Sequence, residues 1–228
     1  MITQIWGVPI YKQSTNFTYS QFTEEEKSIL SKLRESCAVA SNIRKYFPNQ
    51  AEIIKNDGQL LNDPGLKRLK DIITPHADNY IKDVICTDND VFMANSWYTV
   101  NKKGDIHRSH FHRHTLFSVC YYPVAYSGNL VLSSTRGKNS FTQDYLLGMN
   151  YTRFNEFNCM HWEVPISSGD IVIFPGWVEH STTENESDKE RICVGANYWV
   201  HGEMQFTDEL DRITCLLYTS DAADDNTC

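Results

Sequence analysis

The chain has 228 residues, of which 22% are charged, and a formal net charge of -8 at pH 7. This acidic balance argues against a nucleic acid or an anionic membrane surface as partner, because phosphate groups attract clustered Lys and Arg. The sequence has no apolar run of about 18 residues and no leader-like N-terminus, so we expect a cytoplasmic protein that does not cross a membrane.

The first part of the chain, residues 1–90, has the periodicity of helices. Thr23 and Glu26 have the spacing of a capping box, and apolar residues recur after them at helical intervals. A second helical pattern begins after Pro64, and Pro75 is expected to interrupt or kink it. We therefore expect an N-terminal helical region that packs on a sheet and supports it.

Short β-rich runs separated by polar turns fill residues 91–205. Regular short strands are typical of a sandwich or jelly roll, so we expect one mainly β domain with this segment as its core. The stretch Lys138–Met160 is polar and aromatic with weak periodicity, and we expect an insertion near the site. The expected strands are VFMANSWYTV (91–100), HTLFSVCYYPV (114–124), NLVLSS (129–134), DIVIFP (170–175) and RICVGANYWV (191–200).

Four spaced residues indicate a metal site. His110 and His112 are two apart, so on an extended strand their imidazoles point to the same face, and His180 from a distant strand can complete one side of a coordination sphere. Arg191 lies eleven residues further on, where its guanidinium suits bidentate capture of a carboxylate on a metal-bound ligand. The set predicts a metal together with a carboxylate co-substrate.

Each of these residues also has a plainer interpretation. The histidine-rich run is compatible with a solvated turn or an adventitious metal binder. Arg191 could instead be a structural ion-pair partner of Glu179 or Glu190.

The cysteines are scattered without CxxC spacing, which argues against paired thiolate zinc ligands and favours reduced thiols. The C-terminal peptide CLLYTSDAADD, residues 215–225, resembles a translated sequencing-adapter read-through. We therefore expect residues 215–228 to be a non-native tail rather than part of the fold.

The order of the motifs resembles the 2-oxoglutarate/Fe(II)-dependent oxygenases, and most closely a bacterial and phage group within them. The blocks that carry the resemblance are GDIHRSHFHRHTLFSVCYY, SGNLVLSSTR, GDIVIFPGWVEH and RICVGAN, and the opening IWGVPIY is also similar. The resemblance spans nearly all of residues 1–200. It implies a double-stranded β-helix, which is a cupin-like jelly roll that holds iron between its two sheets.

The resemblance implies that His110, His112 and His180 are the iron ligands. Most of the wider superfamily has a carboxylate at the position of His112, so an acid such as Asp105 stays open as the third ligand.

The resemblance also implies the co-substrate contacts. Arg191 matches the residue that pairs with the distal carboxylate of 2-oxoglutarate. Tyr121 and Tyr98 match tyrosines that contact the co-substrate in related prolyl hydroxylases.

The implied activity is that of a dioxygenase that uses Fe(II), 2-oxoglutarate and O2, with ascorbate as reductant, and releases succinate and CO2. Its substrate would be a small molecule or a peptidyl side chain that becomes hydroxylated. Two alternatives stay open: a cupin-like three-histidine metalloprotein that does not use 2-oxoglutarate, and a catalytically dead jelly-roll binding protein.

Overall fold

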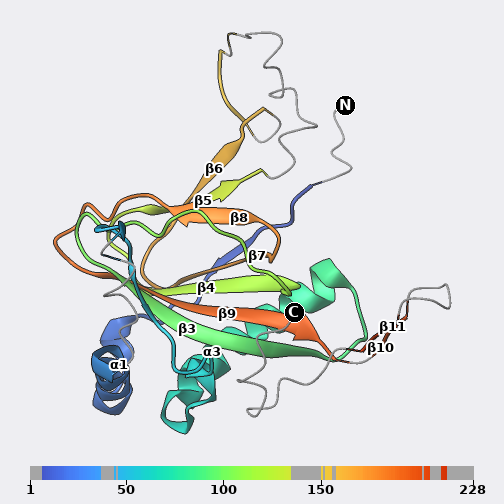
Figure 1. The fold of residues 1–228 in the computed structure, drawn as a ribbon, viewed down its shortest axis with the longest axis horizontal. Helices are drawn as coiled ribbons and strands as arrows, with labels where there is room; N and C mark the ends of the chain where they lie inside the picture. Colours follow the sequence, from blue (N-terminus) through green and yellow to red (C-terminus); the bar gives the residue numbers. More distant parts are fainter. Residues whose placement is uncertain are drawn as a thin grey trace.

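Two antiparallel sheets face each other in the computed structural model, which describes residues 7–36, 44, 46–134, 150, 152–155, 158–201, 203–205 and 212–214. Figure 1 shows the larger, six-stranded sheet lying between the helices and the smaller, three-stranded sheet. The larger sheet runs, in spatial order, β1 (Tyr11–Ser14), β7 (Asp170–Pro175), β4 (Phe117–Val124), β9 (Arg191–Val200), β3 (Val91–Asn101) and β2 (Glu52–Ile54). The smaller sheet runs β6 (His161–Pro165), β5 (Asn129–Ser133) and β8 (Glu179–Thr182).

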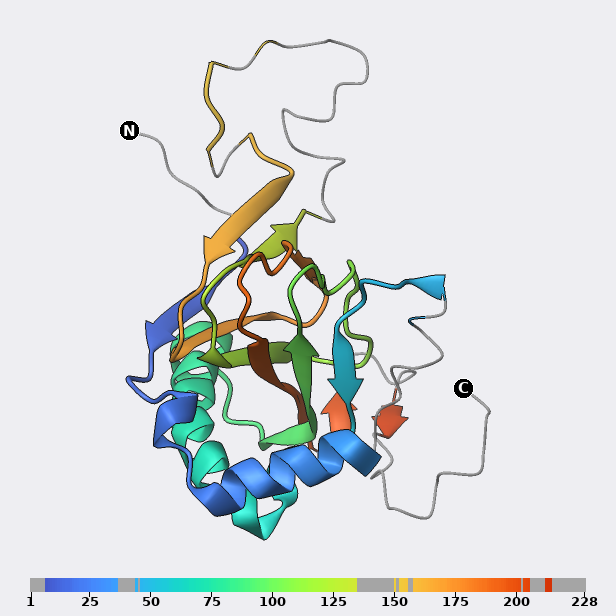
Figure 2. The same ribbon diagram turned by 90° about the vertical axis from the view of Figure 1, so that its left-hand side faces the viewer.

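The helices pack on the outer face of the larger sheet, as Figure 2 shows from the side. The main ones are α1 (Glu24–Ser36) and α3 (Lys67–Tyr80), and the π-helical turn η4 (Ile81–Ile85) continues α3. The short 3-10 turn η1 (Tyr19–Gln21) precedes α1, and the 3-10 turns η2 (Leu60–Asn62) and η3 (Pro64–Leu66) precede α3. A small hairpin of β10 (Glu203–Gln205) and β11 (Arg212–Thr214) follows the core.

The expected helix start is confirmed at α1. The Thr23 backbone N–H donates to Glu26 Oε2 at 2.7 Å, and the Glu26 N–H donates to Thr23 Oγ1 at 3.1 Å, so two otherwise unsatisfied donors are paired. The expected interruption at Pro75 is wrong, because α3 continues through it. Its buried face, which includes Ile73 and Ala77, packs into the core and offsets the hydrogen bond that the proline cannot donate.

The central strands β4 and β7 of the larger sheet are buried on both faces. Val119 and Tyr121 of β4 belong to the core beneath the helices, whereas Cys120 and Tyr122 belong to the core between the two sheets. This alternation follows from the two-residue period of a strand. The inner face of β4, β9 and β3 therefore carries the side chains that meet the smaller sheet.

All five predicted strand runs are strands in the structure. The short strands β1, β2, β6 and β8 were not predicted, and they add the edges of the larger sheet and two of the three strands of the smaller one. Most of the expected insertion and the C-terminal tail lie outside the described residues. Within the described ranges, no helix combines the length and apolarity needed to span a membrane.

Candidate metal and co-substrate site

The three predicted histidines come together between the two sheets. His110 forms an isolated bridge with His180 of β8: His110 N donates to His180 O at 3.0 Å, and His180 N donates to His110 O at 2.8 Å. The backbone N–H of His112 donates to Gly176 O at 3.0 Å. His110 and His112 thus lie on an irregular segment tied to β8, not on the regular strand that was expected.

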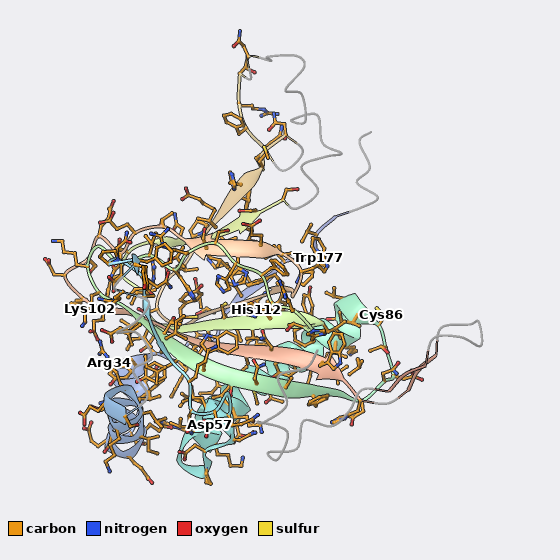
Figure 3. The ribbon with its side chains drawn as sticks, in the orientation of Figure 1. Arg34, Asp57, Cys86, Lys102, His112 and Trp177 are labelled. Atoms are coloured by element: carbon orange, nitrogen blue, oxygen red, sulfur yellow. The ribbon has the colours of Figure 1, made fainter. Side chains whose placement is uncertain are left out.

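The three imidazoles face a common point. One ring nitrogen from each of His110, His112 and His180 lies within 4.8 Å of the others, and this is the group within the described residues that could hold a metal ion. The ring centroids of His110 and His180 are 4.2 Å apart, and the other two pairs are 5.1 and 5.0 Å apart. Figure 3 places His112 in the interior, between the strands of the two sheets, and Trp177 near one end of β8.

Hydrogen bonds set the tautomer of each ring. Nδ1 of His110 donates to Arg108 O at 2.8 Å, and Nδ1 of His180 donates to Val178 O at 3.0 Å. Nδ1 of His112 donates to Asn197 Oδ1 at 2.5 Å. Because all three acceptors are carbonyl oxygens, each Nδ1 carries the proton and each Nε2 keeps its lone pair for a metal.

Burial keeps these rings neutral. It lowers the pKa of His112 to about 4, with a further contribution from nearby His110. Burial also lowers the pKa of His110, and it lowers the pKa of His180 well below the ordinary value. Neutral imidazoles bind metals, so the cluster has the protonation state that a metal requires at neutral pH.

Arg191 is 1% exposed and carries a buried charge. Its guanidinium donates to Thr182 Oγ1 at 2.7 Å and to the carbonyls of Ser127 and Thr183, each at 3.2 Å. No ion pair joins it to Glu179 or Glu190: Glu190 pairs with Arg34, and Glu179 accepts from Ser109. The structural ion pair considered from the sequence is therefore wrong.

A cavity joins the histidines to Arg191. Arg191 gives this cavity a positive charge, which no Asp or Glu of the described part of the chain neutralises from the cavity lining. The lining residues are Trp97, Thr99, Asn101, His107, His110, His112, Cys120, Tyr122, Leu130, His180, Ser181, Thr182, Arg191, Cys193 and Gly195.

Tyr98 and Tyr121 do not reach this cavity. Their hydroxyls donate to Leu30 O and Phe17 O on the helical side of the sheet, and both rings belong to the core beneath the helices. Tyr122, one residue further along β4, lines the cavity instead. A shift of one residue along a strand moves a side chain to the opposite face.

Asp105 is not brought to the histidines either. Its Oδ2 accepts from Arg44 Nη2 at 2.5 Å and from the Lys102 N–H at 2.9 Å, so the carboxylate is held by these two residues. The structure thus offers His112 and not Asp105 beside the other two imidazoles.

Several residues that hold the site were not predicted. Ser118 Oγ donates to Asn197 Oδ1 at 2.8 Å and so fixes the acceptor of His112. Thr182 and Gly128 position Arg191: a Cβ at Gly128 would lie 1.8 Å from Arg191 Nη1. Gly128 and Asn197 lie in recognised sequence blocks, but their roles depend on contacts between distant segments.

Residues 95–197 match the model of the family described as "Putative 2OG-Fe(II) oxygenase". This match confirms the resemblance found in the sequence, and it covers all three histidines and Arg191. No curated protein matches the chain.

Solved structures share the fold. A prolyl-4-hydroxylase from Pseudomonas putida has a TM-score of 0.51 and 12% identity, with 86% of this chain and 94% of that chain covered. The alpha-ketoglutarate-dependent epimerase SnoN from nogalamycin biosynthesis has a TM-score of 0.53 and 12% identity, covering 91% and 90%. HygX from Streptomyces hygroscopicus, with nickel, 2-oxoglutarate and hygromycin B bound, has a TM-score of 0.53 and 14% identity, covering 85% and 83%. These similarities confirm the expected double-stranded β-helix.

Proposed function

We propose that this chain, whose residues 95–197 match the 2OG-Fe(II) oxygenases, is an Fe(II)- and 2-oxoglutarate-dependent dioxygenase that hydroxylates a small molecule or a peptidyl side chain. The observation that carries the proposal is the convergence of three imidazoles, each with its proton on Nδ1 and its Nε2 free. His110, His112 and His180 would hold the iron.

The donor set fits this metal. Imidazole nitrogen suits ferrous iron, and three ligands leave coordination positions for a chelating co-substrate and for oxygen. The carbonyl oxygens that accept from Nδ1 also hold each ring in its orientation. With iron and co-substrate bound, oxidative decarboxylation of 2-oxoglutarate by O2 yields succinate and CO2 and places one oxygen atom in the substrate C–H bond.

Arg191 supports a dicarboxylic co-substrate. Its guanidinium bonds to Thr182, two residues beyond His180 on β8, and alternate residues of a strand are roughly 7 Å apart. That spacing suits a five-carbon dicarboxylate that reaches from the histidines to the guanidinium. A buried arginine without an ion-pair partner among the described residues is a strong binding group for such an anion.

Two exposed aromatic residues lie next to the site along the chain, and they would contact the substrate outside the cavity. Phe111, between His110 and His112, is 52% exposed, and Trp177 is 41% exposed. Trp177 follows Gly176, whose carbonyl accepts from His112. Large apolar surfaces beside a reactive centre favour an organic substrate and exclude water from part of the entrance.

An anaerobic titration with Fe(II) and then 2-oxoglutarate tests the proposal. We expect a saturable visible charge-transfer band from the chelated 2-oxo acid, which disappears with succinate formation when O2 is admitted. His180→Ala should show no band, because one of the three ligands is lost.

The other outcomes would identify the alternatives. Iron that binds without any band on addition of 2-oxoglutarate would favour a cupin-like three-histidine metalloprotein. A protein that binds no Fe(II) would be a catalytically dead jelly roll.

A further inference from the structure

Asn101 ends β3 with a buried amide whose donor is unused. The residue is 2% exposed, and within the described parts of the chain its Nδ2 has no hydrogen-bond partner. Its backbone carbonyl accepts from Asn185 Nδ2 at 2.9 Å, which fixes the main chain at this point. A buried donor without an acceptor destabilises a fold, so a retained one points to an acceptor that arrives with a ligand.

The unused amide lies beside Arg191. Asn101 and Arg191 are directly opposed in the β3–β9 ladder, and both line the cavity that contains the histidines. Three buried side-chain atoms lack a partner in the described residues, namely Arg44 Nε, Asn95 Oδ1 and Asn101 Nδ2. Among the residues that carry these three atoms, Asn101 is the one that lines the cavity.

The cavity has two distinguishable ends. Trp97 and Asn101 share one face of β3, and the Trp97 ring centroid lies 5.3 Å from that of His112 at the metal end. Asn101 is four residues away, opposite Arg191, at the cationic end. An anionic group that reaches Arg191 would therefore meet the unused donor of Asn101.

We propose that Asn101 is a specificity residue for the co-substrate, and that its Nδ2 donates to the distal carboxylate of 2-oxoglutarate beside Arg191. This inference rests on the proposed function. The amide adds a directed donor without adding charge, which fixes how the carboxylate is oriented. A 2-oxo acid that lacks the distal carboxylate would leave both buried donors unpaired and would bind more weakly.

Asn101→Leu tests the inference, because leucine keeps the branched shape and removes the donor. The Kd for 2-oxoglutarate, measured anaerobically from the charge-transfer band, should rise about tenfold or more. The Kd for 2-oxobutyrate, which has the same 2-oxo acid head but no distal carboxylate, should not change. The melting temperature without metal and co-substrate should equal or exceed that of the wild type, because an unpaired buried amide is removed.

Two further variants keep the test interpretable. Asn95→Leu is the control, since Asn95 Oδ1 also lacks a hydrogen-bond partner within the described residues but Asn95 lies outside the cavity, and the 2-oxoglutarate affinity of this variant should equal that of the wild type. Asn101→Asp keeps the shape and can pair with Arg191, so it should fold and should abolish 2-oxoglutarate binding while sparing Fe(II) binding.

The outcomes separate this inference from the proposed function. Wild-type protein that fails to bind 2-oxoglutarate would overturn both. Normal wild-type binding with an unchanged Kd in Asn101→Leu would overturn the Asn101 assignment alone. A lower melting temperature together with weaker Fe(II) binding in Asn101→Leu would make Asn101 structural and would also overturn it.

Discussion

Arg191 combines a positive charge with nearly complete burial, and burial lowers the pKa of its guanidinium from the ordinary value. Its hydrogen bonds to the Thr182 hydroxyl and to the carbonyls of Ser127 and Thr183 do not neutralise its charge. A buried cation of this kind destabilises the protein when no anion is bound, because its charge is desolvated and unpaired. A bound carboxylate would offset this cost. Affinity for the co-substrate should therefore depend strongly on this residue.

Arg191→Gln should raise the Kd for 2-oxoglutarate by about 100-fold, because two charge-assisted hydrogen bonds are lost. Fe(II) affinity should stay unchanged, since the guanidinium is not a ligand. Equilibrium dialysis with each ligand separates the two effects. Arg34→Gln, which removes the ion pairs of α1 with Glu52 and Glu190, is the control, and an equal loss of 2-oxoglutarate affinity there would contradict the assignment.

Asn197 acts on the metal through His112. Its Oδ1 accepts from both His112 Nδ1 and Ser118 Oγ, so it fixes the ring and leaves Nε2 free. Asn197→Ala should lower Fe(II) affinity by about 10- to 100-fold, the usual effect of losing the partner of a ligating histidine. Asn197→Asp, which keeps an acceptor, should restore most of the affinity, measured by competition with a chelator. Equal Fe(II) affinities in wild type and Asn197→Ala would show that Asn197 does not position His112 for the metal.

At the scale of elements, the turn between β4 and β5 shapes the cationic end of the cavity. Gly128 has a φ of 84°, and a Cβ there would meet Arg191 Nη1 at 1.8 Å and the Glu184 carbonyl oxygen at 2.9 Å. Gly128→Ala should therefore displace Arg191 and weaken 2-oxoglutarate binding at least tenfold, as well as destabilise the fold. Gly104→Ala controls for the backbone effect, because Gly104 also has a φ of 84° but a Cβ there would lie 3.8 Å from its nearest neighbouring atom. Calorimetric titration of both variants with 2-oxoglutarate measures the difference.

The N-terminus of α1 depends on a buried carboxylate. The hydrogen bonds from Arg68 hold the pKa of Glu26 below its ordinary value, and the Thr23 N–H contributes to the same shift. Because the folded pKa is the lower one, this stabilisation is present above the ordinary pKa of 4.5 and is lost as the pH falls through the folded pKa.

Glu26→Gln should cost about 1–2 kcal/mol of unfolding free energy at pH 7, as expected for the loss of the charge-assisted hydrogen bonds with Arg68, because glutamine can still accept from the Thr23 N–H. The difference from wild type should shrink toward pH 3, which urea denaturation at both pH values would measure. Glu24→Gln, which removes an exposed ion pair with Lys27, should change little. A difference that does not depend on pH would show that the Glu26 charge is not involved.

For the whole molecule, the sequence sufficed to predict β3, β4 and β9, which carry part of the site, since their apolar runs and turns are clear. It did not identify the inward face of β4, because that strand is buried on both sides and has no polar alternation. This is why Tyr121 was assigned to the cavity where Tyr122 lies. β8 was missed because its four residues, EHST, are short and polar.

The site itself was only partly predictable for a related reason. The histidines and Arg191 form a recognisable spaced pattern. The partners that position them, such as Asn197 for His112 at a separation of 85 residues, depend on register between distant strands. Asn101 carries no motif, and the features that distinguish it, its position opposite Arg191 and its unpaired Nδ2, appear only in the structure.

Ligand binding should stabilise the fold, because the metal would link the segment of His110 and His112 to β8. At concentrations of metal and 2-oxoglutarate about 100 times their Kd, each bound ligand adds about 2.7 kcal/mol, or roughly 5–10 °C in melting temperature. Thermal denaturation with and without EDTA, using Mn(II) in place of Fe(II), measures this. His110→Ala should abolish the metal-dependent increase, and an undiminished increase would place the metal elsewhere.

The most direct test of the central claim is an anaerobic crystal structure with Fe(II) and 2-oxoglutarate. We predict one metal ion bound to Nε2 of His110, His112 and His180, with the distal carboxylate of the co-substrate at Arg191. A metal bound through Asp105 in place of His112, or a co-substrate carboxylate far from Arg191, would contradict it.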